Sequence, residues 1–287
     1  WAAKSKRLRE ASPFGSNPNW RLISCIVKAR DQLRQEMFAQ RLIQEFHHIF
    51  VAAKIPLWLH PYNIIATSSE AGLIETIVDA KSIDSIKKDS PNVVTLQDYF
   101  IGRFGGRGSP GYKRAVRNFV QSMAGYSVVS YLLNIKDRHN GNLMIDAEGH
   151  VIHIDFGFLL SNSPGGNLEF ERSPFKLTNE MAQVMGGTSS GAWKLFRKLS
   201  IQGYVEACRH ANKFMLMVDI LYPGNEKMPC FLQGRDYVLS SLSERFGVDL
   251  SRRERAARMG RLIDTAYGNW TTRAYDQFQR LSLGISK

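Results

Sequence analysis

The stretch that most constrains how this chain can fold is residues 137–157, which read Asp-Arg-His-Asn-Gly-Asn-Leu-Met-Ile-Asp-Ala-Glu-Gly-His-Val-Ile-His-Ile-Asp-Phe-Gly. Short apolar runs flank a turn centred on Glu148, a pattern that predicts a β-hairpin. Folding the hairpin about that turn places Asn142 opposite Ile154. We therefore expect Asn142 and Asp155 to lie together at the open end of the hairpin.

The side chains expected at this open end suit the transfer of a phosphoryl group. Amide and carboxylate oxygens, which Asn142 and Asp155 supply, are ligands that Mg²⁺ accepts in proteins. Asp137 and His139 lie just upstream, in a polar loop at the same end. The spacing from Asp137 to Asn142, followed by an Asp-Phe-Gly triplet at 155–157, is typical of eukaryotic kinases. A polar turn beside a buried strand would explain the triplet alone, but the spacing and the hairpin together favour a kinase.

Composition sets outer limits on the class of protein. With 287 residues, 44% of them hydrophobic, the chain can bury one large core or two lobes. Its cysteines are far apart without metal-binding spacing, which indicates packed thiols in a reducing compartment. No apolar run reaches the roughly 18 residues of a membrane span, and we expect no signal peptide. Because the chain starts within a basic, helix-like segment, we expect it to be part of a longer protein.

The formal net charge of +12 has several possible meanings. A nucleic acid, an anionic membrane and simple solubility would each account for it. The positive residues are spread along the chain, and no recognised nucleic-acid-binding motif accompanies them. We therefore expect no nucleic-acid partner; such a partner would reveal itself by salt-sensitive binding of oligonucleotides.

The order of patterns predicts a two-lobed, kinase-like α+β fold, with a small N-lobe over 1–78 and a larger, mainly helical C-lobe over 79–287. In the N-lobe we expect an antiparallel sheet and one helix. In the C-lobe we expect a flexible polar insertion, a buried helix, the hairpin, an irregular segment and then helices to the end. The expected N-lobe elements are a loop at 12–19, a strand at 20–28, a helix at 31–50, strands at 64–67 and 73–78, and a hinge at 75–78. The expected C-lobe elements are the insertion at 81–111, the buried helix at 116–133, a catalytic loop at 137–142, an activation segment at 155–178 with irregular residues at 159–174, and helices from 178.

Two residues of the N-lobe are candidates for holding the phosphates of ATP. Lys28 ends a strand, as the phosphate-binding lysine of kinases does. Glu36 follows eight residues later in the predicted helix, where an ion pair could hold the lysine ammonium against the α- and β-phosphates. A solvated lysine at a strand end is the alternative.

Other nucleotide contacts are expected from backbone groups. The loop at 12–19 would cover the triphosphate through N–H groups and the hydroxyl of Ser12 or Ser16, although it contains only one glycine. Backbone groups of Glu75 and Ile77 would meet the edge of the adenine, unless this segment is an ordinary edge strand.

The catalytic motifs resemble a particular family. Here the triplet at 137–139 runs Asp-Arg-His, whereas protein kinases have His-Arg-Asp, and His153-Ile154 precedes Asp-Phe-Gly. This order resembles the phosphoinositide 3-/4-kinase superfamily, which includes lipid kinases and large atypical Ser/Thr protein kinases. Residues 163–187 resemble the activation segment of type III phosphatidylinositol 4-kinases, and residues 17–22 and 56–62 resemble the beta group among them.

The chain also departs from that family. After the lysine the family usually has x-Gly-Asp-Asp-Leu-Arg-Gln, and this chain has Ala-Arg-Asp-Gln-Leu-Arg-Gln at 29–35. One aspartate is therefore lost, while Asp31 and Glu36 match acidic positions that are kept. Thr76 stands where the beta enzymes often have proline.

The resemblance implies transfer of the γ-phosphoryl group of ATP to the 4-hydroxyl of phosphatidylinositol. It implies that Asn142 and Asp155 hold Mg²⁺, with Mn²⁺ as a second option, and that Lys28 stabilises the phosphates. Either Asp137 or His139 would orient the inositol hydroxyl and accept its proton. The ordinary pKa of histidine, near 6.5, favours His139 as the base, with Asp137 as its positioning partner.

Substrate choice is expected to depend on residues 158–178. A phosphorylated headgroup needs several cations, and this segment offers Arg172 and Lys176 against Glu169 and Glu171. This balance favours unphosphorylated phosphatidylinositol, unless the segment is simply a loop and the substrate is chosen elsewhere.

The substrate's location implies contact with a membrane. The aromatic and basic residues of 270–285 could form a helix that touches the membrane surface, or could pack on the C-lobe. The resemblance further implies a cytoplasmic enzyme, peripheral on Golgi membranes, with regulatory or recruiting proteins that bind outside this chain. An atypical Ser/Thr protein kinase, which would accept peptides, and an inactive kinase-fold scaffold are the alternative functions.

Overall fold

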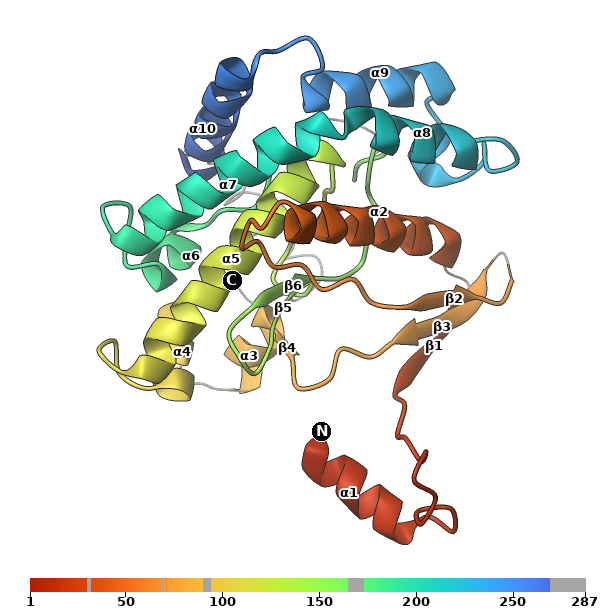
Figure 1. Ribbon diagram of the computed structural model, residues 1–287. Coiled ribbons are helices and arrows are strands. Elements are labelled where there is room, and N and C mark those ends of the chain that lie inside the picture. Colours follow the sequence, from red (N-terminus) through yellow and green to blue (C-terminus); the bar gives the residue numbers. More distant parts are fainter. Residues whose placement is uncertain (30–31, 69, 90–93, 165–172, 269–287) are drawn as a thin grey trace.

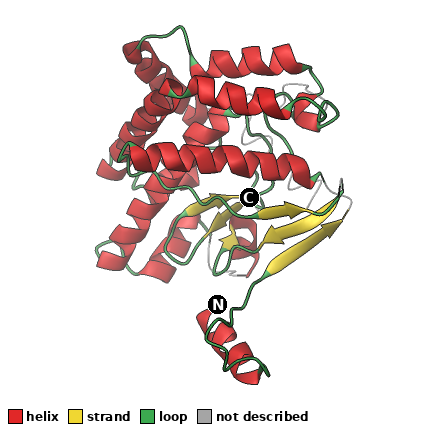
Figure 2. Ribbon diagram, turned by 45° about the vertical axis from the view of Figure 1, so that its right-hand side comes forward, coloured by secondary structure: helices red, strands yellow, loops and turns green. Residues whose placement is uncertain are grey.

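The computed structural model describes residues 1–29, 32–68, 70–89, 94–164 and 173–268. It has the predicted α+β fold, with two small antiparallel sheets beside a larger set of helices (Figures 1 and 2). The strands are β1 (Cys25–Ala29), β2 (Ile64–Ala66), β3 (Ala71–Glu75), β4 (Lys81–Ser82), β5 (Leu143–Ile145) and β6 (Val151–His153). The helices are α1 (Ala2–Ala11), α2 (Leu33–Ala52), α3 (Ile83–Asp89), α4 (Leu96–Phe104), α5 (Pro110–Leu132), α6 (Asn179–Val184), α7 (Gly191–Arg209), α8 (Ala211–Leu221), α9 (Arg235–Phe246) and α10 (Arg252–Gly268), with a 3₁₀ turn η1 (Pro229–Phe231).

The first sheet has the strand order β1–β3–β2, and helix α2 packs on one of its faces. Lys28 of β1 pairs with Gly72 of β3. A Cβ atom at Gly72 would lie 2.9 Å from the side chain of Leu33, at the start of α2, and 2.2 Å from the carbonyl oxygen of Ile65. The missing side chain at Gly72 therefore lets the start of α2 approach the sheet directly opposite Lys28.

The second sheet contains the predicted hairpin. β5 and β6 pair with Leu143 opposite His153 and Ile145 opposite Val151, and β4 adds a short strand on the outside of β5. Gly149 turns the chain with φ of +91°, a conformation that glycine adopts at little cost. The turn thus falls where the sequence predicts it, and the hairpin prediction is confirmed.

Helix α5 is the centre of the core. It contacts α4, α7, α9 and β6, and most of its side chains are buried. The aromatic ring of Phe46 on α2 stacks on Phe214 of α8, with 4.0 Å between the ring centroids. Burial of these large apolar surfaces is the main source of stability, and it joins α2 to the helices that follow the hairpin.

Several predicted boundaries are wrong. Residues 81–111 are not a flexible insertion, because their described part contains β4, α3 and α4. Thr95 and Asp98 form a capping box at the start of α4, and Ser109 caps α5, which begins at Pro110 rather than at residue 116. These polar residues satisfy helix ends that the apolar pattern alone does not reveal. The predicted strands at 20–28, 64–67 and 73–78 are shorter or shifted, with observed bounds at β1, β2 and β3.

Other expectations hold or stay open. The predicted helix at 31–50 is confirmed in substance as α2, and the helix-like start of the chain is α1, which lies apart from the other helices (Figures 1 and 2). The division into lobes at residue 78 stays a prediction. Among the residues described, no helix is both long enough and apolar enough to cross a membrane. Asp31, Arg172 and the proposed helix at 270–285 lie outside the described residues.

Candidate active site

The residues of the catalytic loop are held together by the backbone at the open end of the hairpin. The Ile154 N–H donates to the Asn142 carbonyl oxygen over 3.1 Å, so these residues face each other as predicted. The Asn142 side-chain amide donates to the Asp137 carbonyl oxygen over 3.0 Å, and its backbone N–H donates to that of His139 over 3.0 Å. Asn142 therefore ties the loop, including both candidate proton acceptors, to the hairpin end that leads to Asp155.

Arg138, for which no sequence motif predicts a role, supports this end of the hairpin through hydrogen bonds to its backbone. Its side chain is 1% exposed and lies with the guanidinium carbon 5.3 Å from the centre of the Phe156 ring. It donates to the carbonyl oxygens of Ile154 (2.7 Å) and Asp155, and to that of Lys136 (2.9 Å). A planar guanidinium can bind several carbonyls at once, so the buried charge is well solvated by backbone dipoles.

Asp137 and Asp155 share an unusual backbone conformation. Their φ angles are +63° and +61°, in the left-handed region that residues with a Cβ rarely adopt. Such conformations persist where the surrounding structure fixes them, and they concentrate at functional sites. Asp155 is exposed, whereas the next residue, Phe156, is completely buried. The buried ring anchors the chain while the carboxylate faces solvent.

Asn142 and Asp155 suit a hard metal ion. Since the Asn142 amide nitrogen donates to Asp137, the amide oxygen is the atom left to bind a cation, and Asp155 adds an exposed carboxylate. Within the described ranges, no group of at least three His, Cys, Asp or Glu side chains could hold a metal. Such a sparse donor set matches Mg²⁺, which usually keeps water and substrate phosphate as its remaining ligands.

His139 has one ring nitrogen engaged by the backbone. The Gly141 N–H donates to Nδ1 over 3.0 Å, so the neutral imidazole carries its proton on Nε2. Nε2 in turn lies 4.0 Å from Oδ2 of Asp137. Burial lowers the pKa of His139 below its ordinary value; Arg138 and Lys176 lower it further, while Asp137 and Asp155 oppose the shift. His139 is therefore neutral near pH 7, with an N–H directed to the side on which Asp137 lies.

Lys28 and Glu36 come from elements that face each other. Lys28 is half-buried on β1 and Glu36 is buried in the first turn of α2, on the face of the sheet where Gly72 allows close approach. Glu36 accepts a hydrogen bond from the Tyr62 hydroxyl over 2.8 Å. Burial, together with the negative charge of Glu36, raises the pKa of Tyr62 well above its ordinary value, so Tyr62 remains a donor. The structure thus holds the Glu36 carboxylate in place at the start of α2 through Tyr62, which lies just before β2.

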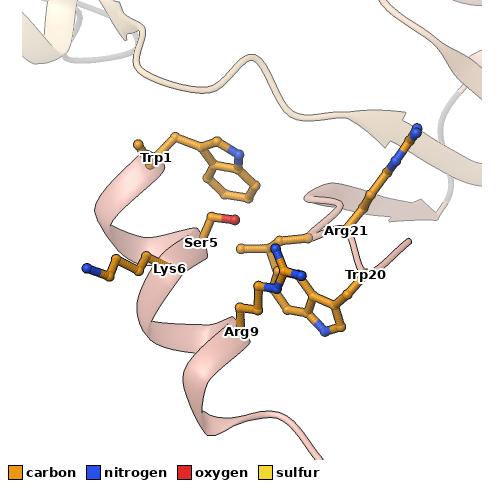
Figure 3. Close-up of a pocket in the computed structure, with 8 residues that line it drawn as sticks. Trp1, Ser5, Lys6, Arg9, Trp20 and Arg21 are labelled. Carbon is orange, nitrogen blue, oxygen red and sulfur yellow. The ribbon is translucent and has the colours of Figure 1, made fainter. Parts of the chain in front are cut away.

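Ser12 and the loop at 12–19 are predicted to contact the nucleotide. Ser12 follows α1, where its hydroxyl accepts from the Phe14 N–H over 3.2 Å. A hollow of about 560 Å³ beside α1 is lined by Trp1, Lys6, Arg9, Trp20 and Arg21, among others (Figure 3). Figure 1 shows this region apart from the hairpin. The role of Ser12 and of the loop at 12–19 stays a prediction.

The hinge residues are partly engaged within the first sheet. The Glu75 N–H donates to the Asn63 carbonyl oxygen over 2.9 Å, and the Glu75 carboxylate accepts from Asn63 in return. Ile77 packs partly buried against the core. The Glu75 N–H is therefore already used, and a role for backbone groups of Glu75 and Ile77 in adenine binding stays a prediction.

Lys176, which the sequence predicts to help select the lipid headgroup, is buried. It is 4% exposed, and its charge is close enough to His139 to lower the pKa of that imidazole. Nearby, Lys136 donates to the Ser173 carbonyl oxygen over 3.0 Å and so fixes the end of the activation segment. Lys176 is thus buried beside the catalytic loop rather than displayed on the surface of the segment.

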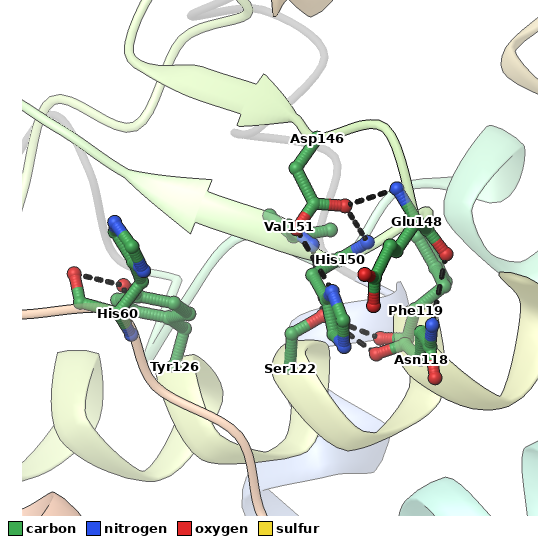
Figure 4. A network of polar contacts seen from close by, with 9 residues as sticks. All are labelled: His60, Asn118, Phe119, Ser122, Tyr126, Asp146, Glu148, His150 and Val151. Atoms are coloured by element: carbon green, nitrogen blue, oxygen red, sulfur yellow. Dashed lines mark hydrogen bonds and ion pairs between the residues drawn. The ribbon is translucent and has the colours of Figure 1, made fainter. Parts of the chain in front are cut away.

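A polar network holds the far end of the hairpin (Figure 4). The Ser122 hydroxyl on α5 accepts from the Val151 N–H over 2.8 Å and donates to the Asn118 carbonyl oxygen over 2.9 Å. His150 lies 2.8 Å from the Asp146 carboxylate. These contacts fix the hairpin on the central helix, so the positions of Asn142 and Asp155 follow from a rigid support.

The amino-acid sequence of the chain is similar to those of known phosphatidylinositol kinases. The model of the family described as phosphatidylinositol 3- and 4-kinase matches residues 22–223. A phosphatidylinositol 4-kinase of Dictyostelium discoideum is 45% identical over 99% of this chain and 24% of its own length. Phosphatidylinositol 4-kinase beta 1 of Arabidopsis thaliana is 46% identical over 99% of the chain and 25% of its own length, and phosphatidylinositol 4-kinase beta of Xenopus tropicalis is 43% identical over 99% and 35%. The chain spans about a quarter to a third of the length of these relatives. With the family model matching more than half of its residues, the chain belongs to the phosphatidylinositol 3- and 4-kinase family.

Proposed function

We propose that this chain transfers the γ-phosphoryl group of ATP to the 4-hydroxyl of phosphatidylinositol. The observation that carries the proposal is the open end of the hairpin, where the backbone pairing of Asn142 with Ile154 brings the Asn142 amide next to Asp155 and the catalytic loop. The names of the similar proteins, which are phosphatidylinositol 4-kinases, support this acceptor.

Asn142 and Asp155, through a bound metal ion, and Lys28 would offset the negative charge of the ATP phosphates. Asn142 and Asp155 would hold Mg²⁺, which when bound neutralises the phosphates and polarises the transferring group. Lys28 would bind the α- and β-phosphates, oriented by the nearby helix that carries Glu36. Mn²⁺ is the second candidate, because oxygen donors of this kind suit both ions.

For proton transfer we propose the reverse of the roles expected from sequence. The Nδ1 atom of His139 accepts from Gly141, and Nε2 carries the proton, so neither nitrogen is ready to accept another. Asp137 has a partly exposed carboxylate on the same side. Asp137 would therefore orient the inositol hydroxyl and take its proton, and the His139 Nε2–H would stabilise the oxygen from which the proton leaves.

The setting of the reaction is part of the proposal. Because the acceptor is a lipid, the active site must approach a membrane surface. The family resemblance implies the Golgi membrane. Recruiting or regulatory proteins would bind elsewhere on the longer protein. Unphosphorylated phosphatidylinositol is the favoured headgroup, because the buried Lys176 is poorly placed to meet an additional phosphate.

Labelled ATP offered with phosphatidylinositol vesicles and, separately, with peptides tests the acceptor class. We expect labelled phosphate to be transferred to the lipid only when Mg²⁺ is present. We expect no such transfer by the Asp155→Asn variant. Label in peptides alone would reject it and move the chain to the Ser/Thr kinases of the superfamily. Label in neither would also reject it, and nucleotide binding would then favour a scaffold.

A further inference from the structure

The side chain of Gln35 lies at a junction of three segments that are far apart in the sequence. Its amide nitrogen donates to the carbonyl oxygens of Phe156 (3.1 Å) and Gly157 (2.6 Å). Its amide oxygen accepts from the Cys230 N–H over 2.9 Å. The residue is 1% exposed. Helix α2, the Asp-Phe-Gly segment and the 3₁₀ turn η1 thus meet at one side chain.

Burial makes these contacts hard to replace. A buried amide without partners is destabilising by about 1–3 kcal/mol, so buried glutamines are kept where their hydrogen bonds are satisfied. Both polar atoms of Gln35 have partners, and the same turn of α2 buries Leu33 and Glu36. An apolar residue would pack at this position but would leave the Phe156 carbonyl and the Cys230 N–H without this partner, while the Gly157 carbonyl would keep only its hydrogen bond from the Asn162 amide.

Gln35 and Arg138 together hold four successive carbonyl groups. Arg138 donates to those of Ile154 and Asp155, and Gln35 donates to those of Phe156 and Gly157. The peptide groups on both sides of Asp155 are therefore fixed from different directions. This double restraint accounts for a left-handed aspartate whose carboxylate remains exposed.

The hydrogen bond from Cys230 to Gln35 extends this restraint to η1, in the C-terminal part of the chain. The Ser161 hydroxyl donates to the Cys230 carbonyl oxygen over 2.7 Å, while the Cys230 N–H donates to Gln35. The same peptide region of η1 thus contacts both α2 and the start of the activation segment. Movement of α2 relative to residues 155–161 would break several buried hydrogen bonds at once.

We propose that Gln35 is a positioning residue for metal binding: it fixes the backbone that aims the Asp155 carboxylate and couples α2, which carries Glu36, to that carboxylate. The inference rests on the proposed role of Asp155 as a metal ligand. Residues that orient metal ligands typically change metal affinity or activity by about 10- to 100-fold when replaced.

The test compares Gln35→Met, Gln35→Glu and Gln40→Met in the otherwise unchanged chain. Gln40 is a matched control, since it lies on the same helix, is 5% exposed and accepts from the Tyr62 N–H over 3.1 Å. Gln35→Glu keeps the size of the side chain and an acceptor for Cys230 but cannot donate to the carbonyls when ionised. Thermal unfolding checks that each variant is folded, and the Mg²⁺ concentration needed for half-maximal binding of a fluorescent ATP analogue is the main readout.

Both Gln35 variants are expected to raise this Mg²⁺ concentration about tenfold or more, while metal-free nucleotide binding changes little. Gln40→Met is expected to lower the melting temperature without changing the Mg²⁺ requirement. An unchanged Mg²⁺ requirement in folded Gln35→Glu, or an equal rise in Gln40→Met, would overturn the proposal. Because this assay contains no lipid, failure of lipid phosphorylation by the unsubstituted chain would reject the proposed function and leave the comparison valid.

Discussion

The backbone N–H of Gly141 donates to Nδ1 of His139 over 3.0 Å and so determines which imidazole nitrogen carries the proton. The close approach depends on glycine, because a Cβ atom at this position would lie 2.9 Å from both Nδ1 and Cε1 of the ring. This contact is the basis on which we propose His139 as a hydrogen-bond donor and Asp137 as the proton acceptor.

Gly141→Ala should displace the imidazole and reduce turnover about tenfold or more, with a smaller effect on the KM for ATP. Gly102→Ala is the matched control, since a Cβ there meets no atom within 4 Å and lies on helix α4. That control should leave turnover unchanged and stabilise the helix by up to about 1 kcal/mol. Equal turnover in both variants would show that the His139 contact is unimportant for the reaction.

The assignment of the proton acceptor predicts different losses at two positions. Asp137→Asn should reduce turnover by about 10²- to 10⁴-fold, the usual contribution of a general base. His139→Gln, whose amide can still donate a hydrogen bond, should lose less. Turnover against pH for both variants decides the matter, and a greater loss in His139→Gln would reverse the roles.

Buried His153 should make the fold sensitive to acid. Burial, aided by the charge of Arg138, lowers the pKa of His153 well below its ordinary value of 6.5. Below about pH 6.5 the unfolded chain therefore binds a proton that the folded chain does not, and the free energy of unfolding falls as the pH falls. The contribution of this one group to the slope is at most about 1.4 kcal/mol per pH unit.

His153→Phe isolates this contribution. The imidazole stacks on Tyr126 with 4.3 Å between ring centroids, and a phenyl ring can keep the stack without binding a proton. Urea unfolding between pH 5 and 7 should show a shallower loss of stability in this variant. Parallel curves for His153→Phe and the unsubstituted chain would contradict the account.

Ser122→Ala should destabilise the chain by about 1–3 kcal/mol, because it leaves the buried Val151 N–H without its acceptor. Ser200 is an equally buried serine whose hydroxyl only donates to the Phe196 carbonyl oxygen within α7. Ser200→Ala should therefore have a clearly smaller effect. Denaturant midpoints would measure both changes, and similar losses would mean that Ser122 does not support the hairpin specifically.

The hairpin could be predicted because its signals are local: apolar runs, a glycine turn and polar ends lie within one short stretch. The helices within 81–111 are not predicted from sequence, because the polar, glycine-containing composition is typical of a loop and only the single cap residues Thr95 and Ser109 indicate where α4 and α5 begin. Gln35 was missed for a different reason. Its partner Phe156 lies 121 positions away, and no sequence pattern indicates that the two will meet.

Arg138 illustrates the same limit at shorter range. The residue types of the catalytic loop were recognised by their spacing, but the arginine between the acid and the imidazole carried no separate signal. Its importance follows from the carbonyls of Ile154 and Asp155, which reach it only when the hairpin closes. Residues that perform chemistry could thus be found from motifs, and residues that position them required the fold.

The most direct test of the account is the position of the phosphate on the lipid product. The chain is incubated with Mg²⁺, labelled ATP and phosphatidylinositol vesicles, and the isolated product is compared with 3-, 4- and 5-monophosphate standards. We expect the unsubstituted chain to form the 4-monophosphate and the Asp155→Asn variant to form no lipid monophosphate. A product phosphorylated at another position, or one formed equally by Asp155→Asn, would contradict it.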